Sequence, residues 1–294
     1  MSRRIALATY ERAPQLAPDD QLLPPALASL GVFAEPVVWS SKSTKWDQYD
    51  AIVIRSCWDY HLRFAEFLTW LATLEASGIA VFNSPKLVRW NADKRYLLNL
   101  AQRGVATIPT IIVPRGRLRD VESLAVAEGW TRFVLKPTVS ASGYETYSLR
   151  TPLDADARAL VAQVTALGDA LLQPFVEEVA RNGEHSFTFI DGAFSHATLK
   201  RAAPGEFRVQ TEHGGSVEPV IAAPSLVEQA THVLRVLPET PLYARVDGVA
   251  RGDAFLLMEL ELIEPNLFLT AADDAAERLA RAINRRLSRS RSPI

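Results

Sequence analysis

Short apolar runs alternate with helix-like stretches over the first third of the chain. A continuous apolar run such as YDAIVIRS, at 49–56, is typical of a parallel strand buried on both faces. Helical patterns at 22–30 and 64–77 separate these runs, and such alternation indicates βαβ units. We therefore predict a small parallel-sheet domain over residues 1–84. Its strands are expected at 4–9, 32–39, 49–56 and 79–83.

The pattern changes twice after this domain. An α+β segment, 85–172, is expected to begin with a helix over 85–103 that ends at Gly104. From Leu171 onward the strands read as antiparallel, which predicts a third segment over 173–294. The fold class is thus α/β followed by α+β. The remaining elements are expected at 107–113, 121–128, 132–137, 145–150, 171–176, 185–190, 193–201, 226–237, 243–263 and 271–287.

The stretch RVDGVARGDAFLLMELELIEP, at 245–265, predicts a hairpin with charges on one face. A three-residue loop at 251–253 would place Ala250 opposite Ala254, Arg245 opposite Glu259 and Asp247 opposite Leu257. A two-residue loop would shift the register by one and scatter the charges. On the first register, Arg245, Asp247, Glu259 and Glu261 share a face, while Val246, Met258 and Leu260 pack on the core.

Clustered carboxylates repel each other unless a cation lies among them. Oxygen ligands without His or Cys suit Mg²⁺, which proteins hold through one or two carboxylates plus substrate phosphates. A solvated sheet face with ordinary acidic residues is the alternative. The hairpin therefore raises the question of whether the chain also offers a phosphate site.

Composition and charge narrow the class of protein. The 294 residues carry a net charge of −2 and are 48% hydrophobic, so we expect a globular protein without affinity for nucleic acid or membrane. Cys57 is the only cysteine, which excludes an internal disulfide and fits a cytoplasmic location. No apolar run approaches the length of a membrane span. The basic tail, 286–294, reads as a solubilising end, with a nucleic-acid arm as the alternative.

Two lysines are candidates for phosphate binding. Lys136 ends the apolar strand FVLK, and a buried ammonium is costly unless it is paired. The loop that follows offers backbone N–H groups and the hydroxyls of Thr138, Ser140 and Ser142. Lys94, in NADK, would lie in the first turn of a helix capped by Asn91, where a cation hints at an external anion. A lysine that reaches the surface beside an ordinary turn is the alternative for Lys136.

The segment LLQPFVEE, at 171–178, joins an apolar strand to a proline-containing link. Such a link offers backbone groups to an adenine edge, and Glu177, Glu178 or Glu184 could accept hydrogen bonds from ribose. A plain connection between strands is the alternative. The segment indicates a nucleotide site only in combination with the two lysines.

The order of these features resembles the ATP-grasp superfamily of carboxylate–amine ligases, particularly glutathione synthetase and D-alanine–D-alanine ligase. The resemblance covers about residues 85–270. NADK and VLKP are similar to the family's two nucleotide lysines. RVD and ELE are similar to its Arg-x-Asp and Glu-x-Asn motifs, although Glu261 stands where Asn is usual and the loop TVSASG has a single glycine.

The resemblance implies a fold, cofactors and site residues. It implies an ATP-grasp fold behind the first domain, with ATP and Mg²⁺ (or Mn²⁺) bound. Asp247, Glu259 and Glu261 would hold the metal, and Arg245 and Arg208 would be catalytic. The expected nucleotide-binding residues are Lys94, Lys136, Ser140, Ser142, Gly143, Gln173, Phe175, Val176 and Glu184.

The implied reaction passes through an acyl phosphate and joins a carboxylate to an amine, within one molecule or between two. A cycloserine-forming ligase is one relative of similar architecture. A small-molecule kinase and a non-catalytic nucleotide-binding protein are the alternatives. The expected partner is a small amino-acid-like substrate, and a homodimer or homotetramer is compatible with the family.

Substrate residues are expected at two places. Arg55 and Asp59 follow a parallel strand, where α/β sheets bind ligands, so Arg55 could hold a carboxylate and Asp59 an ammonium. A strand end with Trp58 in the core is the alternative. The resemblance adds Arg201 and the pair Gly214 and Gly215.

Overall fold

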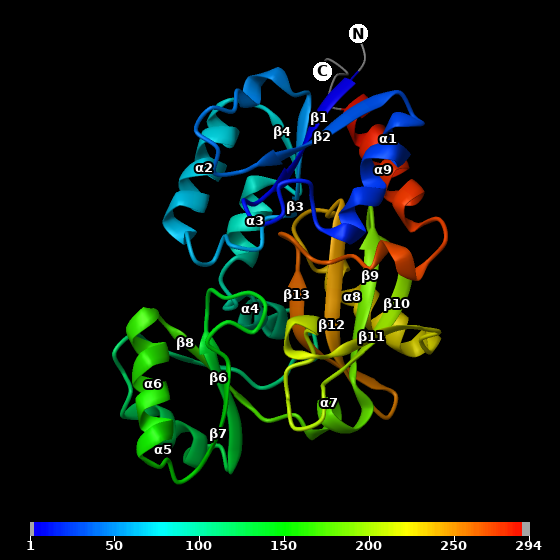
Figure 1. The fold of residues 1–294 in the computed structure, drawn as a ribbon. Coiled ribbons are helices and arrows are strands. Elements are labelled where there is room, and N and C mark those ends of the chain that lie inside the picture. Colours follow the sequence, from blue (N-terminus) through cyan, green and yellow to red (C-terminus); the bar gives the residue numbers. More distant parts are fainter. Residues whose placement is uncertain (1–2, 290–294) are drawn as a thin grey trace.

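The computed structural model describes residues 3–289, which form three β-sheets with helices packed around them (Figure 1). The last five residues of the basic tail lie outside this range, so its role stays a prediction. No helix within the described range has both the length and the apolar character needed to cross a bilayer. Short 3₁₀ turns lie at Pro18–Leu22, Trp46–Gln48, Thr211–His213 and Leu269–Ala271.

The first sheet is parallel, as the continuous apolar runs predict. Its strands pair in the order β2-β1-β3-β4, and β3 is buried over its whole length. Burial on both faces explains why β3 lacks the alternation of a half-exposed strand. The elements are β1 (Arg3–Thr9), α1 (Leu23–Ala28), β2 (Val32–Val38), β3 (Ala51–Ser56), α2 (Phe64–Ala76) and β4 (Ala80–Phe82).

The second sheet is antiparallel, with strand order β5-β8-β6-β7. β8 pairs with β6 and β5, so the strand at 171–176 belongs to this sheet and not with the later strands. The helix α6 lies in a stretch where the sequence pattern predicts no element. Asp154 begins it by accepting a hydrogen bond from the Ala157 amide at 2.8 Å. The elements are β5 (Ile111–Val113), α5 (Asp120–Ala127), β6 (Arg132–Pro137), β7 (Tyr147–Arg150), α6 (Ala155–Leu167) and β8 (Ala170–Pro174).

The third sheet is also antiparallel, in the order β11-β10-β9-β12-β13. Its two hairpins place charged side chains of β9, β10, β12 and β13 next to one another. The amphipathic helix α8 packs its apolar face on one side of this sheet. The elements are α7 (Glu177–Asn182), β9 (Glu184–Ile190), β10 (Ala193–Arg201), β11 (Ser216–Val220), α8 (Pro224–Arg235), β12 (Tyr243–Arg251) and β13 (Ala254–Glu261).

The single helix expected over 85–103 is two helices, α3 (Pro85–Asn91) and α4 (Tyr96–Gln102). Asn91 does not cap a helix. Its side chain donates to Leu260 O and accepts from Leu262 N, both at 2.8 Å, which satisfies the free edge of β13. Lys94 therefore lies in the break between the helices, where its amide donates to Thr138 O at 2.8 Å.

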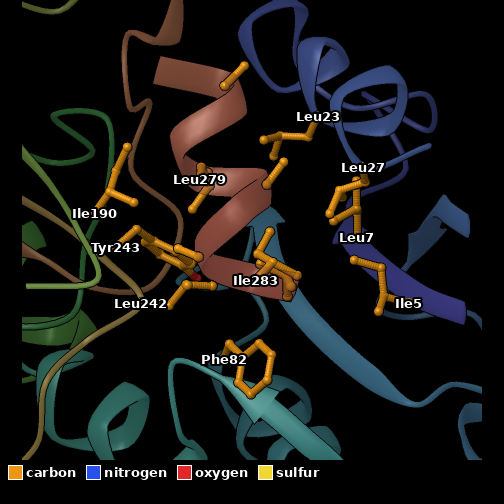
Figure 2. Close-up of a cluster of buried hydrophobic side chains, with 14 of the residues drawn as sticks. Ile5, Leu7, Leu23, Leu27, Phe82, Ile190, Leu242, Tyr243, Leu279 and Ile283 are labelled. Carbon is orange, nitrogen blue, oxygen red and sulfur yellow. The ribbon is translucent and has the colours of Figure 1, made fainter. Parts of the chain in front are cut away.

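The last helix, α9 (Ala275–Arg289), returns to the first sheet. Leu279 and Ile283 pack in one cluster with Leu7 of β1 and Leu23 of α1 (Figure 2). The chain thus closes its N-terminal sheet with its C-terminal helix (Figure 1). The segment between β13 and α9 is therefore held at one end by the third sheet and at the other end by the first sheet, through α9.

The β12–β13 hairpin differs from the predicted register. Its turn has two residues, Gly252 and Asp253, with Gly252 at φ +60°, and Arg251 pairs with Ala254. A β-bulge then leaves Met258 without a partner. Beyond the bulge Asp247 pairs with Glu259, and Arg245 with Glu261.

With a two-residue turn alone, the charged residues of the two strands would point to opposite faces of the sheet. The extra residue at the bulge shifts the pairing by one and returns them to the same face. Arg245, Asp247, Glu259 and Glu261 consequently share a face, as predicted, although the expected partners and turn length were wrong. Leu257 moves to the core with Val246 and Leu260, whereas Met258 lines the opposite side. The β9–β10 hairpin uses the same arrangement, with a turn at Asp191–Gly192 and a register shift before His196.

Candidate functional site

One pocket lies where the three sheets meet. Its walls come from the loop after β3, the α3–α4 break, β6 and its loop, the β8–α7 link, and the charged face of the third sheet. Most of the predicted site residues line it. They are Lys94, Lys136, Ser140, Ser142, Gly143, Gln173, Phe175, Val176, Glu184, Arg208, Arg245, Asp247, Glu259 and Glu261.

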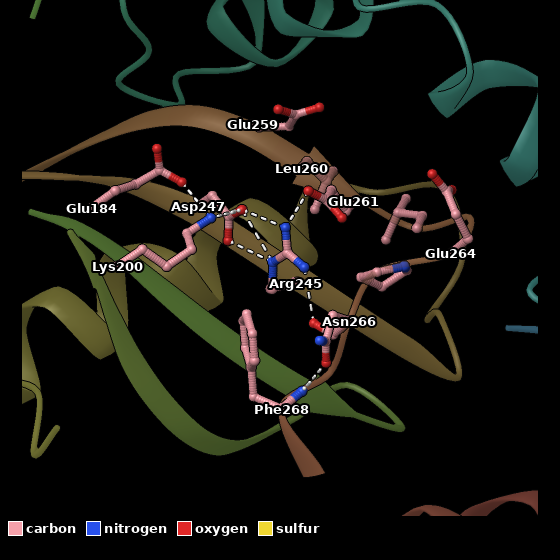
Figure 3. A network of polar contacts seen from close by, with 12 residues as sticks. Glu184, Lys200, Arg245, Asp247, Glu259, Leu260, Glu261, Glu264, Asn266 and Phe268 are labelled. Atoms are coloured by element: carbon pink, nitrogen blue, oxygen red, sulfur yellow. Dashed lines mark hydrogen bonds and ion pairs between the residues drawn. The ribbon is translucent and has the colours of Figure 1, made fainter. Parts of the chain in front are cut away.

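Arg245 is the centre of a buried ion network on the third sheet (Figure 3). Its guanidinium donates to both oxygens of Asp247, to Glu261 and, at 2.9 Å, to Asn266 O. Burial opposes the charge of Arg245, but Asp247 and Glu261 raise its pKa. The side chain is therefore a fixed positive charge in the pocket wall.

Lys200 continues this network toward Glu184. Its ammonium lies 2.8 Å from Asp247 Oδ2 and 2.5 Å from Glu184 Oε1. Burial opposes ionisation of Asp247, yet Arg245 and Lys200 together lower the pKa of this carboxyl. Asp247 is consequently ionised and held in one orientation.

Glu259 and Glu261 have different electrostatic surroundings. Glu259 pairs with Lys94 Nζ at 2.9 Å, and Lys94 with Lys136 lowers its pKa despite burial. Glu261 has Arg245 as its cation, but burial and the nearby Asp247 and Glu259 raise its pKa to about 7. The protein cations near this face therefore do not fully compensate the negative charge of the Glu261 carboxylate.

The donor set of this face fits a magnesium ion. Within residues 3–289 no three potential ligands converge on one point, because Asp247, Glu259 and Glu261 each turn toward a protein cation. Mg²⁺ rarely needs three protein ligands, since phosphate oxygens and water complete its shell. All three carboxylates line the pocket from neighbouring positions on two paired strands.

Lys136 is the cation without a partner in this pocket. No hydrogen bond or ion pair to its ammonium exists within residues 3–289, and burial lowers its pKa. By contrast, Lys94 is fixed by Glu259 and by Ser140 O, which it donates to at 2.5 Å. An anion that binds beside a half-buried, unpaired ammonium would stabilise its charged form.

Two loops that line the pocket with Lys94 and Lys136 contact each other. Gly143, at φ +69°, lies so close to the next loop that a Cβ would be 3.2 Å from Arg208 Cδ and from His213 Nε2. Arg208 is held by Glu206, whose pKa it lowers to about 2. A side chain in place of this glycine would therefore be crowded by the neighbouring loop.

The β8–α7 link lines the other side of the pocket through Gln173, Phe175 and Val176. Of the three acids considered for ribose, only Glu184 lies in the pocket. Glu178 accepts from Arg251 Nε at 2.6 Å, and Glu177 lies 3.6 Å from Arg132. The ribose contact remains a prediction, with Glu184 as its one candidate inside the pocket.

Known proteins with the same architecture identify the family. A family model described as the N-terminal domain of D-cycloserine synthetase DcsG matches residues 5–83. The cycloserine biosynthesis protein DcsG of Streptomyces lavendulae is 35% identical over 287 residues, which are 92% of this chain and 95% of that protein. The chain belongs to the DcsG family of ATP-grasp ligases.

Solved structures agree with this family. The crystal structure of D-cycloserine synthetase DcsG superposes with a TM-score of 0.88 at 32% identity, covering 97% of this chain and 99% of that one. D-Alanine–D-alanine ligase of Bacillus anthracis, in its complex with ATP, superposes at 0.69 with 16% identity and 98% coverage of both chains. The ATP-grasp fold expected from the two lysines and the RVD and ELE motifs is confirmed.

Two predicted substrate residues of this DcsG-family chain lie outside the pocket. Arg55 is fully buried, donates to Asp20 Oδ1 at 2.9 Å and to Pro265 O at 2.7 Å, and stacks on Tyr243. Asp59 accepts from Trp39 Nε1 at 2.8 Å. Protein groups therefore bind Nε and Nη2 of Arg55 and one oxygen of Asp59, and neither side chain lines the pocket, so the predicted direct substrate contacts have no support in this geometry.

Three further residues predicted near the substrate also lie outside the pocket. Arg201 is exposed and lies 3.4 Å from Glu218. Gly214, at φ +81°, ends a 3₁₀ turn, and at Gly215 a Cβ would lie 2.1 Å from Val209 O. The two glycines thus shape the loop behind the pocket wall rather than line it.

Strand alternation explains the error at Arg201. Neighbouring residues of β10 point to opposite faces, so Lys200, not Arg201, enters the pocket. Lys200 lies opposite Glu184 in the β9–β10 hairpin, and residues that pair across a hairpin point to the same face. Pairing the two strands in the sequence would therefore have indicated Lys200 as the pocket residue. In the turn after β3, Trp58 and Tyr60 line the pocket, and Asp59 does not.

Proposed function

We propose that this protein is an ATP-dependent ligase that closes a C–N bond within a small amino-acid-like substrate and releases ADP and phosphate. The supporting observation is Lys136, an unpaired ammonium that shares one pocket with three carboxylates and Arg245. Such a pocket matches a magnesium–polyphosphate ligand in charge. Its family relationship to D-cycloserine synthetase DcsG supports ring closure and a cycloserine-like product.

The first chemical step would transfer the γ-phosphoryl group of ATP to the substrate carboxylate. A carboxylate oxygen forms the new bond to phosphorus, and the bond to the β-phosphate oxygen breaks as ADP leaves. Lys94 and Lys136 would neutralise the phosphate oxygens. Asp247, Glu259 and Glu261 would hold Mg²⁺, which supplies further positive charge for the transferred group.

The second step would form the ring. A nitrogen of the same substrate attacks the acyl carbon, the carbon–oxygen bond to phosphate breaks, and the nitrogen loses a proton. Arg245 would stabilise the tetrahedral oxyanion, because Asp247, Glu261 and Asn266 O already fix its guanidinium. A fixed charge needs no reorganisation as the oxyanion develops.

This proposal is tested by measuring ADP release with Mg²⁺ and a panel of amino acids and their side-chain derivatives, with mass spectrometry of the products. We expect one ADP per cyclised product. ADP release with a phosphorylated final product would instead indicate a kinase. Absence of ATP binding by the wild-type protein would contradict both enzyme activities.

Replacing Lys136 with Ala is expected to weaken ATP binding about 10- to 100-fold, because a charge-assisted contact contributes roughly 1.5–3 kcal/mol. Isothermal titration calorimetry with Mg²⁺ measures this change. Lys42→Ala is the matched control. Lys42 is exposed, lies between β2 and β3, and does not line the pocket. Unchanged ATP affinity of Lys136→Ala would remove Lys136 from the nucleotide site.

A further inference from the structure

The end of the pocket beyond Glu261 has a different chemistry from the nucleotide end. Trp58 and Tyr60 reach it from the turn after β3, and Glu264 reaches it from the segment after β13. Figure 3 shows Glu264 beyond Glu261, on the side away from Lys200. This end therefore presents aromatic rings and a carboxylate, and no lysine or arginine of residues 3–289 forms an ion pair with that carboxylate.

Two pocket glutamates of the described range have a carboxylate without a cation, and they differ in that Glu212 is exposed whereas Glu264 is half-buried. Within residues 3–289 Glu264 forms no ion pair, whereas Glu184, Asp247, Glu259 and Glu261 each have one. Burial, with Glu261 nearby, raises the pKa of Glu264 well above its usual range. An unpaired carboxylate in such surroundings is stabilised by a cationic ligand.

Three buried contacts hold the segment that carries Glu264. Trp58 Nε1 donates to Glu264 O at 3.0 Å, Arg55 Nη2 to Pro265 O at 2.7 Å, and Tyr243 OH to Ile263 O at 2.8 Å. All three use backbone oxygens, so none of them occupies the Glu264 carboxylate. The segment is thus fixed while its acidic group stays available, as a binding site requires.

The surroundings favour an organic cation over a second metal ion. A metal such as Mg²⁺ needs about six oxygen ligands, and the groups beside Glu264 are largely aromatic. An ammonium group needs only one or two acceptors and gains from a neighbouring aromatic face. Trp58 is linked to Glu264 by its hydrogen bond and therefore stays beside it.

We propose that Glu264 binds the ammonium group of the ligase's amino-acid-like substrate and retains it in the cyclised product, with Trp58 and Tyr60 as the adjoining wall. The inference rests on the proposed function and specifies its substrate end. Glu264 would act by positioning, because an anchored ammonium orients the substrate carboxylate toward the lysines.

The test compares two probes that differ by one amino group. D-Cycloserine carries the amine, and isoxazolidin-3-one is the same ring without it. With ADP and Mg²⁺ present, we expect calorimetry to show wild-type protein binding D-cycloserine about 10- to 100-fold more tightly than the amine-free ring. Glu264→Gln is expected to bind both rings with the same weak affinity, while Glu264→Asp regains part of the difference.

Two controls separate this role from a structural one. Glu128→Gln makes the same chemical change at an exposed position outside the pocket and should match the wild type. Without ligand, Glu264→Gln should melt at the wild-type temperature or above it, because it removes an unpaired, half-buried charge. A lower melting temperature would indicate that the carboxylate supports the fold instead.

The remaining outcomes are also decisive. A wild-type protein that binds the two rings equally, or binds neither, would overturn the assignment of Glu264. So would a Glu264→Gln variant that keeps the preference for the amine. If ATP still binds in these cases, the ligase proposal stands without its substrate anchor, whereas loss of ATP binding in the wild type refutes the ligase proposal itself.

Discussion

Replacing Glu259 with Gln is expected to lower the rate of ADP formation by about 100-fold or more while the fold is retained. The variant keeps the size of the side chain but removes one of the three carboxylates proposed to hold Mg²⁺. It also leaves Lys94 without its ion-pair partner, 2.9 Å away. Steady-state ADP release measures the rate, and circular dichroism checks the fold.

The control for this variant is Glu218→Gln, on the exposed strand β11, which should retain wild-type activity. Thermal shift provides a second readout that does not depend on the substrate. Mg²⁺ with ATP should raise the melting temperature of the wild type more than either alone, and Glu259→Gln should lose this synergy. Full turnover in EDTA would contradict the metal site.

Arg55→Ala is expected to destabilise the protein by about 3–5 kcal/mol, because it leaves Asp20 buried without its cation. Asp20 would retain only the Ser56 hydroxyl, 2.8 Å away. The loss also removes the contact to Pro265 O that joins the first sheet to the segment after β13. Urea unfolding at neutral pH measures the change in the free energy of unfolding.

Arg63→Ala is the matched control, because Arg63 is partly exposed and pairs with the exposed Glu66. Its removal should change the free energy of unfolding by about 0–1 kcal/mol. In Arg55→Ala, replacing Asp20 with Asn as well should recover part of the lost stability, since the unpaired charge is gone. Wild-type stability together with a raised substrate KM would restore Arg55 as a direct substrate contact.

The parts of the fold that the sequence predicts are those in which local pattern and burial agree. The parallel strand at 49–56 is buried on both faces, so its apolar run alone identifies it. Lys136 was singled out because a cation that ends an apolar strand is costly without a partner, and Lys94 was singled out as a cation in a helical first turn, a placement that the structure contradicts. The break at Lys94 was missed, because it depends on the hydrogen bonds of Asn91 to a strand far along the chain.

Long-range pairing also explains the errors in the candidate site. Nothing in the residues around Arg55 reveals that Asp20 and Pro265 O occupy its guanidinium. A β-bulge adds one residue to a strand without a reliable local signal, so the partners of Arg245 and Asp247 could not be counted from the turn. Their common face was still predicted correctly, because the assumed three-residue turn and the observed bulge give the same parity.

The bulge at Met258 has a consequence for how relatives of this protein are recognised by sequence motifs. Deletion of Met258 would leave every other pairing in place, with Gly248 opposite Leu257 and Asp247 opposite Glu259. The interval between the Arg-x-Asp and Glu-x-Glu motifs would then be one residue shorter, although the same side chains would face the pocket. A motif search that fixes this interval would therefore reject proteins with an identical site, and a profile that allows a gap at this one position would retain them.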